Sequence, residues 1–397
     1  MWSTILLLGS AHGVIVALLL LRARGNRIAN RLLAALLVGV VLLITPYTIG
    51  YAGFYDAYPW LSFAPLDWRL GFGPLIYLYV RQLGAATLPR GWGWHLGPAL
   101  VQGGYYAVIF AMPLAFKNDW DERVHVRWIV PVEACAMYAS MAVYGVLAAR
   151  RYRATQRWLE DNSAAREEYR MSWVRGFLLA FAAVVAVQLG FDLVEVAGAR
   201  LDYFDRFPLY LAFTALVYFL GIEGWRNAER RWPEMDRELD AAPDAATATA
   251  TSMADTTDAG HREAVAGQGN VEAGDAVEVA AKAERDWAAI GQGWAERVTQ
   301  EGWWREPELS LADLARRLGT NTRYLSRAFN EGLGVSFSEL INRQRVEEAK
   351  RRLGGEGEIL AIALEVGFAS KASFNRAFKA YAGCTPSEFR AGARRGS

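Results

Sequence analysis

Two short stretches near the C-terminus carry polar and cationic side chains that are suited to contacts with base pairs. Arginine can bind guanine with two hydrogen bonds, asparagine can pair with adenine, and a serine hydroxyl can contact either base. Lysine side chains and helix N-termini are suited to phosphates. These residue types at helical spacing therefore indicate recognition of double-stranded DNA. The candidate DNA-binding residues are Thr322, Arg323, Ser326 and Arg327 in the first stretch, and Lys371, Ala372, Ser373, Asn375, Arg376 and Lys379 in the second.

The first stretch is predicted to lie on the second helix of a helix-turn-helix unit. Ser310-Leu-Ala-Asp313 is similar to a capping box, which marks a helix start. Apolar residues then recur at helical spacing, and Gly319 is a typical helix stop. A second helix follows from about Asn321 to Asn330, and such a pair joined by a tight turn is a helix-turn-helix pattern. Its expected inner face consists of Leu325, Ala328 and Phe329.

The same pattern returns after a long connecting helix. Ser336-Phe-Ser-Glu339 is a full capping box, and the helix that it opens is expected to run to Arg352 and to end before Gly354. A short apolar helix then stops at Gly367, and Ser370 is expected to cap a helix that reaches about Tyr381. The expected inner face of this last helix consists of Phe374, Ala377 and Phe378.

The charge of this region permits binding to DNA but does not decide the matter. Residues 303–397 contain 16 lysines and arginines against 11 acidic residues, which is a net charge of +5. A basic face can bind phosphates, whereas the simplest alternative for any one of these side chains is a solvated surface charge. Two helix-turn-helix units in tandem are much less often accidental than one charged face.

The spaced residues of the second unit resemble the signature of the AraC/XylS family of transcription regulators. The match extends over about Leu309 to Arg390, and the connecting helix resembles the family too, through Arg343, Arg345, Val346 and Ala349. The residues that carry the resemblance in the second unit are Gly367, Phe368, Ser370, Phe374, Arg376, Phe378, Lys379, Gly383, Thr385, Pro386, Phe389 and Arg390.

The resemblance implies two units held by one long helix, with the two second helices in successive major grooves of DNA. By position, the first reading helix would use Arg323, Ser326 and Arg327, with Thr322 at its edge. The second would use Lys371, Ala372, Ser373, Asn375 and Arg376, with Lys379 on phosphate. Two residues depart from the family pattern: Ala372, where a polar side chain is common, and Glu358, where a hydroxyl cap is common. For Arg376 the family leaves base contact, phosphate contact and a structural role open.

The N-terminal part is predicted to span a membrane seven times. A helix needs about 20 apolar residues to cross a bilayer. The third candidate segment is short and contains Gly71, Gly73 and Pro74. The seven candidate segments are Thr4–Leu21, Leu32–Tyr51, Leu70–Gly84, Leu96–Phe116, Trp128–Ala149, Trp173–Ala197 and Pro208–Ile222.

Arginine clusters orient these segments. Clusters follow the first segment at 22–31, the fifth at 150–175 and the seventh at 226–231. Loops rich in arginine face the cytoplasm. Seven spans with the N-terminus outside place all three clusters, and the C-terminal domain, in the cytoplasm. Deleting the third span alone would move the second cluster outside. Two motifs, Gly73–Arg81 and His95–Pro98, also resemble a subgroup of the same regulators with seven membrane spans.

Three carboxylates within or near the spans are candidates for a ligand or cation site: Glu133, Asp192 and Glu195. Asp192 and Glu195 are three residues apart and share one helix face. Ionisable groups in spans are functional candidates, but these lie near the outer ends, so solvated helix ends are the alternative. The aromatic outer loops likewise suit either a ligand-binding mouth or interfacial anchoring. The histidines show no metal-ligand spacing, and no metal is expected.

Residues 233–282 are predicted to form a disordered acidic linker. The stretch has no Phe, Trp or Tyr, so it cannot bury enough apolar surface to order itself. A flexible coil of about 50 residues spans on the order of 40 Å. Such a linker cannot transmit a rotation, which favours control by effective concentration or by dimerisation, with pairing through a helix near 283–299. A plain solubilising spacer is the alternative.

The sequence therefore predicts an all-α protein of three parts: a seven-helix transmembrane bundle over 1–226, the linker over 233–282, and a DNA-binding domain over 283–397 with its core at 309–390. We expect a multi-pass protein of the cytoplasmic membrane that couples a signal, from an unknown small ligand or the membrane itself, to promoter binding. A homodimer is a further expectation. Enzyme motifs are absent from the sequence, so neither catalysis nor a cofactor is expected. The alternative function is a transporter-like or anchoring protein that tethers a DNA locus without sensing.

Overall fold

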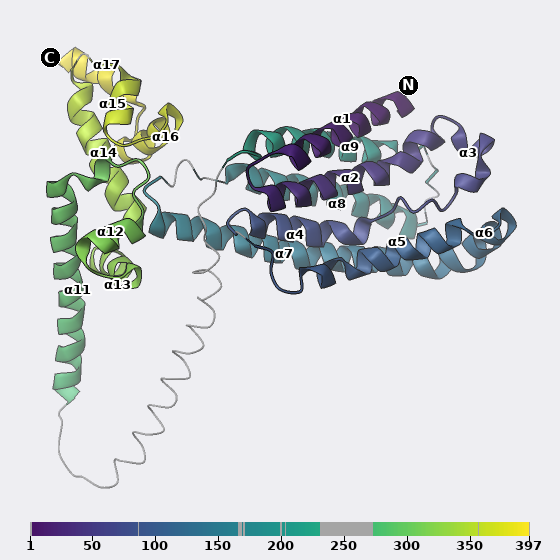
Figure 1. The fold of residues 1–397 in the computed structure, drawn as a ribbon, viewed down its shortest axis with the longest axis horizontal. Helices are drawn as coiled ribbons and strands as arrows, with labels where there is room; N and C mark the ends of the chain where they lie inside the picture. Colours follow the sequence, from purple (N-terminus) through teal and green to yellow (C-terminus); the bar gives the residue numbers. More distant parts are fainter. Residues whose placement is uncertain are drawn as a thin grey trace, which may run out of the picture. The chain divides into compact units, whose positions relative to one another are not determined.

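The computed structural model describes residues 2–230 and 273–396, apart from residues 86, 166–168, 170, 199–200, 203 and 356. Within these ranges the chain is helical (Figure 1), and one isolated antiparallel β-bridge pairs Ser163 with Ser310. The chain divides into two compact units. The first consists of Met1–Arg153 and Met171–Asp236, and the second of Ala154–Arg170 and Arg237–Ser397.

The first unit packs its helices through close contacts at small residues. α1 packs against α2 and α9, and α2 packs also against α4 and α9. A Cβ added at Gly13 of α1 would lie 2.7 Å from Val41 and 2.8 Å from Val217, so glycine permits the close approach of the three helices. The elements of this unit before α7 are α1 Trp2–Arg22, α2 Arg27–Gly50, α3 Phe54–Ala57, η1 Pro59–Leu61, η2 Arg69–Gly71, α4 Phe72–Gln82, η3 Trp92–Leu96, α5 Gly97–Phe110, α6 Leu114–Trp120 and the π-helical η4 Asp121–Ile129.

Three long helices follow: α7 Val130–Asn162, α8 Ser172–Val196 and α9 Phe207–Asn227. Among the described residues, five helical segments are long and apolar enough to cross a membrane. They are Trp2–Arg22, Arg27–Gly50, Leu114–Asn162, Ser172–Val196 and Phe207–Asn227.

The prediction of seven spans is wrong in its third and fourth segments, Leu70–Gly84 and Leu96–Phe116. The helices found there, α4 and α5, have 11 and 14 residues. At 1.5 Å per residue they reach only about 16 and 21 Å, which is short of the hydrocarbon core of about 30 Å. Hydropathy alone does not show where glycine and proline interrupt a helix.

The second unit is built around one long helix, α14, which packs against η5, α15, α16 and α17. Its core is apolar and includes Phe337, Ile341, Phe374 and Phe378, all fully buried. The elements of this unit after α9 are α11 Ala273–Glu301, η5 Trp303–Arg305, α12 Leu311–Leu318, α13 Thr322–Arg327, the π-helical η6 Ala328–Gly332, α14 Phe337–Leu353, α15 Ile359–Glu365, α16 Lys371–Ala382 and α17 Pro386–Gly396.

The predicted linker, 233–282, falls mostly outside the described residues. Its last ten residues, 273–282, are helical and form the first part of α11, and the bounds of the linker stay a prediction. Sequence 273–283 is rich in alanine, which has the highest helix propensity. The lack of aromatic residues therefore did not by itself exclude a helix.

One face of α11 is covered within its own unit, because α11 packs against η6. A Cβ added at Gly291 would lie 2.6 Å from the carbonyl oxygen of Ala328. The rings of Trp287 and Trp294 lie 4.4 and 6.0 Å from that of Tyr324. Pairing of two chains through residues 283–299 stays a prediction, and it would have to use another face of this helix.

Candidate nucleic-acid interface and a pocket in the first unit

The first helix-turn-helix unit is shaped by local caps that the sequence predicts. The Ser310 hydroxyl accepts a hydrogen bond from the Asp313 amide at 3.1 Å and donates to the Asp313 carboxylate at 2.6 Å. This bond from the hydroxyl lowers the pKa of Asp313. Gly319 ends α12 with a φ of 70°, a left-handed conformation that suits glycine. The Asn321 side chain then accepts from the Tyr324 amide at 2.7 Å and starts α13.

The inner faces of the two candidate reading helices correspond when residues are counted from their caps, Asn321 and Ser370. Leu325, Ala328 and Phe329 are fully buried, as predicted, with the last two in the π-helical turn that continues α13. Their counterparts in α16 are also buried, with exposures of 0–1%. These counterparts are Phe374, Ala377 and Phe378.

The outer faces carry all but one of the candidate DNA-binding residues. Counted from the two caps, Arg327 and Arg376 hold equivalent positions, as do Ser326 and Asn375. The side chains of Thr322, Ser326 and Asn375 are half-buried. The exposed members are Arg323, Arg327, Lys371, Ala372, Arg376 and Lys379.

Ser373 is the exception, because it is only 2% exposed. Its hydroxyl donates to the Ser370 carbonyl oxygen at 2.8 Å and lies 3.0 Å from the Ser370 hydroxyl. The prediction that Ser373 lies on the exposed face is therefore wrong. A serine in the first turn of a capped helix can fold back onto the cap, and residue type alone does not reveal that choice.

Arg327 has two partners within the DNA-binding unit. Its Nε donates to Glu331 at 2.6 Å, and its guanidinium lies 4.9 Å from the ring centroid of Trp287. The i,i+4 spacing of Arg327 and Glu331 could have revealed the ion pair. Both side chains are more than half exposed, and such a pair contributes only about 0.5 kcal/mol. The ion pair with Glu331 therefore holds Arg327 only weakly. Arg323 makes no ion pair with any described residue.

Arginine side chains hold the two helix-turn-helix units on α14. Arg345, 1% exposed, donates to the carbonyl oxygens of Trp304 at 2.7 Å and Glu306 at 2.6 Å. Arg352 connects α14 to α15 by binding Glu348 at 2.8 Å and Glu365 at 2.5 Å. The hydrogen bond from Arg352 lowers the pKa of the Glu348 carboxyl.

Near the end of α12, Arg317 binds both carboxylate oxygens of Glu306, which precedes the helix, at 2.6 and 2.7 Å. These hydrogen bonds lower the pKa of the Glu306 carboxyl. The ion pair therefore connects the segment that follows η5 with the last turn of α12.

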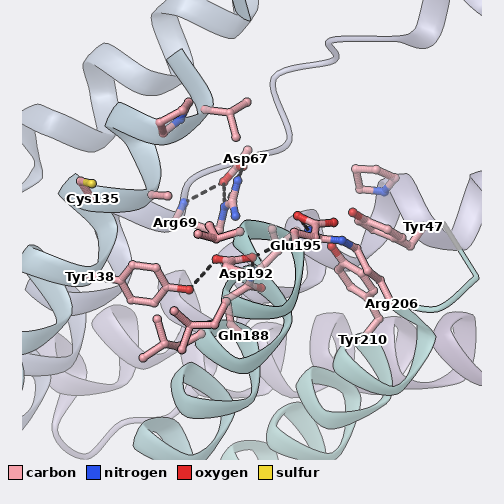
Figure 2. A pocket seen from close by; sticks show the side chains of 18 of the residues that line it. Tyr47, Asp67, Arg69, Cys135, Tyr138, Gln188, Asp192, Glu195, Arg206 and Tyr210 are labelled. Carbon is pink, nitrogen blue, oxygen red and sulfur yellow. Dashed lines mark hydrogen bonds and ion pairs between the residues drawn. The ribbon is translucent and has the colours of Figure 1, made fainter. Parts of the chain in front are cut away.

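The first unit contains a cavity of about 650 Å³ at which polar side chains from several helices meet (Figure 2). Its lining combines apolar residues such as Leu43 and Leu189 with three acids and two arginines. α2 contributes Tyr47, α7 contributes Tyr138, and α9 contributes Tyr210. The charged members of the lining are Asp67, Arg69, Asp192, Glu195 and Arg206.

Two of the three predicted ligand-site carboxylates meet in this cavity. Asp192 accepts hydrogen bonds from the Tyr138 hydroxyl at 2.6 Å and from Gln188 at 2.8 Å, as Figure 2 shows. Arg206 binds Glu195 at 2.5 Å and lies 3.7 Å from Asp192. Next to them, Arg69 pairs with Asp67. Spacing indicated that Asp192 and Glu195 share a face, but not that Arg206 lies between them.

Glu133, the third predicted carboxylate, does not line this cavity. Its carboxylate accepts a hydrogen bond from the Tyr106 hydroxyl at 2.9 Å instead. In the described part of the chain, no group of three or more His, Cys, Asp or Glu side chains could hold a metal ion.

Comparison with known proteins places the likeness in the second unit. A family model described as a helix-turn-helix domain matches residues 314–392. An uncharacterized HTH-type transcriptional regulator of Staphylococcus aureus (strain MSSA476) is 42% identical over 84 residues, which are 21% of this chain and 11% of that protein. The HTH-type transcriptional activator AarP of Providencia stuartii is 39% identical over 83 residues, which are 21% of this chain and 62% of AarP.

Among solved structures, the C-terminal domain of AraT, a response regulator from Geobacillus stearothermophilus, is 30% identical over 26% of this chain and 84% of that one, with a TM-score of 0.25. The chain spans only about a tenth of the length of the Staphylococcus aureus relative. The AraC-type regulators that this part of the chain resembles are a non-enzymatic family. The matched range agrees with the resemblance read from the sequence over Leu309–Arg390. The C-terminal part of this chain is a DNA-binding helix-turn-helix domain of the AraC type.

Proposed function

We propose that this chain is a membrane-embedded transcription regulator that binds specific DNA sequences through both helix-turn-helix units. The observation that carries the proposal is the equivalence of the two reading helices. Arg327 and Arg376 follow their caps at the same distance, and both are exposed above buried, matching inner faces. One chain unites this domain with five helices long enough to span a bilayer, counted over the described residues.

The orientation of the five spans supports a cytoplasmic DNA-binding domain. Five, like seven, is odd, so an outside N-terminus still brings the C-terminal domain to the inner side. The arginine clusters at 22–31, 150–175 and 226–231 then all face the cytoplasm, as the positive-inside rule requires. In this proposal α4 and α5 enter the membrane region without crossing it.

Each outer-face residue has a role that its chemistry suits. Arg323 and Arg327 contact guanine, Asn375 contacts adenine, and Ala372 packs on a thymine methyl group. The remaining outer-face residues assist DNA binding from the edges of the two helices, where their cationic groups and hydroxyls can contact phosphates. These members are Thr322, Ser326, Lys371, Arg376 and Lys379.

Replacing Arg327 by alanine is expected to weaken specific binding by about 1–3 kcal/mol and to relax preference at one base pair. The measurement is selection of bound duplexes from a randomised pool by the full chain in nanodiscs. Two controls separate the causes. Glu331→Gln frees Arg327 and should bind at least as tightly as wild type, whereas Arg351→Ala removes an exposed arginine of α14 and should change no base preference.

Equal weakening on every sequence would assign Arg327 to phosphate contact instead. Failure of the wild-type chain to enrich any sequence, together with retention of DNA at the membrane, would favour the alternative of an anchor that tethers DNA without reading it.

We further propose that the cavity around Asp192, Glu195 and Arg206 binds the small ligand that the regulator senses. Its lining offers an apolar body and charged groups of both signs, which suits a small amphipathic molecule. Asp192→Asn should shift the output of a reporter gene under an enriched site several-fold, while the affinity of the purified, ligand-free protein for DNA stays unchanged. Glu133→Gln, outside the cavity, is the matched control. An unchanged reporter in Asp192→Asn would remove the cavity from the signalling path.

A homodimer remains part of the proposal, because paired DNA-binding domains raise each other's effective concentration at adjacent sites. Because α11 packs against η6 through the face that carries Gly291, two chains would have to pair through other surfaces.

A further inference from the structure

Ser163 and Ala164, which directly follow α7, are built into the DNA-binding unit. Ala164 is 2% exposed and belongs to the same apolar core as Leu309 and Ile341. Its amide donates to the Leu309 carbonyl oxygen at 3.1 Å, and Ser163 pairs with Ser310 in an antiparallel bridge. The backbone of 163–164 thus adds a short strand-like contact to the segment that leads into α12.

The carbonyl oxygen of Ala164 also has dedicated partners on α14. It accepts hydrogen bonds from the Asn342 amide and from the Arg345 guanidinium, both at 3.3 Å, and both side chains are nearly fully buried. Removing Ala164 would leave these buried donors short of an acceptor, which is unfavourable. Asn342, Arg345 and the surrounding apolar core therefore form a seat that is specific for a peptide segment, and residues 163–164 of this chain occupy that seat.

The last turn of α7 reaches η6, the π-helical turn that continues the first reading helix. Asp161 forms a hydrogen bond with the side chain of Asn330, which itself donates to the Ser326 hydroxyl at 3.1 Å. Ser326 is one of the proposed DNA-contact residues, and Asn330 follows it by one helical turn on the same side. A carboxylate held at this place repels DNA phosphates.

We propose that residues 161–165 form a docking segment that inhibits DNA binding while it is seated, and that its release activates the regulator. This inference rests on the proposed function and adds its mode of control. The route of the signal is α7, which runs unbroken from Val130 to Asn162. Its first turns supply Val130, Cys135 and Tyr138 to the cavity, so a change there acts on the helix that carries the docking segment.

The first test releases the segment in the full chain in nanodiscs, with the duplex that the wild type enriches from a randomised pool as probe. Ala164→Asp places a charge in the apolar seat and should tighten binding about ten-fold, a common size for coupling between sites. Asp161→Asn should tighten it several-fold. Glu160→Gln removes the neighbouring charge and should leave the affinity unchanged. Unchanged or weaker binding in both released variants overturns the proposal.

The second test locks the segment reversibly, so that it does not depend on tolerance of Ala164→Asp. Ser163→Cys and Ser310→Cys are combined in a background with Cys135→Ser and Cys384→Ser. Cross-strand partners lie close enough for a disulfide. The oxidised protein should bind the duplex about ten-fold more weakly than the reduced one, and the Ser310→Cys single variant controls for loss of the α12 cap.

The two tests separate the two proposals. Failure of the cysteines to crosslink in membranes would show that the segment does not dock. Crosslinking without a change in affinity would show that docking does not inhibit. If neither the wild type nor any released variant enriches a duplex, the proposed function fails and the inhibition fails with it, while the crosslink still reports docking.

Discussion

Replacing Gly367 by alanine is expected to destabilise the second unit by about 4 kcal/mol, through backbone strain and overpacking together. Gly367 has a φ of 93°, which an L side chain rarely adopts, and an added Cβ would lie 2.5 Å from the carbonyl oxygen of Arg305. That oxygen belongs to the backbone of η5 and cannot turn aside as a flexible side chain would. The turn between α15 and α16 would have to move away from η5.

Gly383 provides the matched control for this prediction. Its φ is 77°, but an added Cβ would meet nothing within 4 Å. Gly383→Ala should therefore show the conformational part alone, about 1 kcal/mol. Hydrogen exchange of the amides of α15 and α16 in the full chain measures both free energies of opening. Equal losses at the two positions would mean that the contact of Gly367 with Arg305 does not constrain the turn.

Arg345→Met is expected to lower the stability of the same unit by about 3 kcal/mol, because methionine fills the space but leaves buried carbonyl oxygens without donors. The guanidinium serves Trp304, Glu306 and Ala164 at once and lies 5.5 Å from the ring centroid of Phe368. Lysine cannot replace it, since a single ammonium group does not reproduce the planar fork.

Arg343→Met is the control for Arg345, because Arg343 lies on the same helix but is 59% exposed and pairs only at the surface with Glu339. Its loss should change the stability by less than about 0.5 kcal/mol. The same exchange experiment, read on the amides of η5 and α14, compares the two. A small effect at Arg345 would mean that water can replace its hydrogen bonds, and the seat of the docking segment would then be less specific than proposed.

The local pattern of the sequence predicted the DNA-binding domain closely. The caps at Ser310, Ser336 and Ser370 each bind the backbone amide three residues later. The inner faces of α13 and α16 are buried as expected. These features depend on interactions within a few residues of each other and on a period of 3.6 residues, so the sequence alone determines them.

The structure decided several features that residue type and hydropathy leave open. The buried hydroxyl of Ser373 and the ion pair of Arg327 concern the direction of one side chain, which residue type leaves open. Helix length, and with it five candidate spans in place of seven among the described residues, depends on where glycine and proline end a helix.

Two contacts join residues that are far apart in the sequence, so a local pattern cannot predict them. Arg206 lies near Asp192, and Arg345 donates a hydrogen bond to the carbonyl oxygen of Ala164. Such contacts arise only when whole helices pack, because burial and the pairing of buried donors are settled among all neighbours together. The sequence by itself thus determined that the chain combines a double helix-turn-helix with long apolar helices. Packing decided which side chains remain available to DNA and which stabilise the domain.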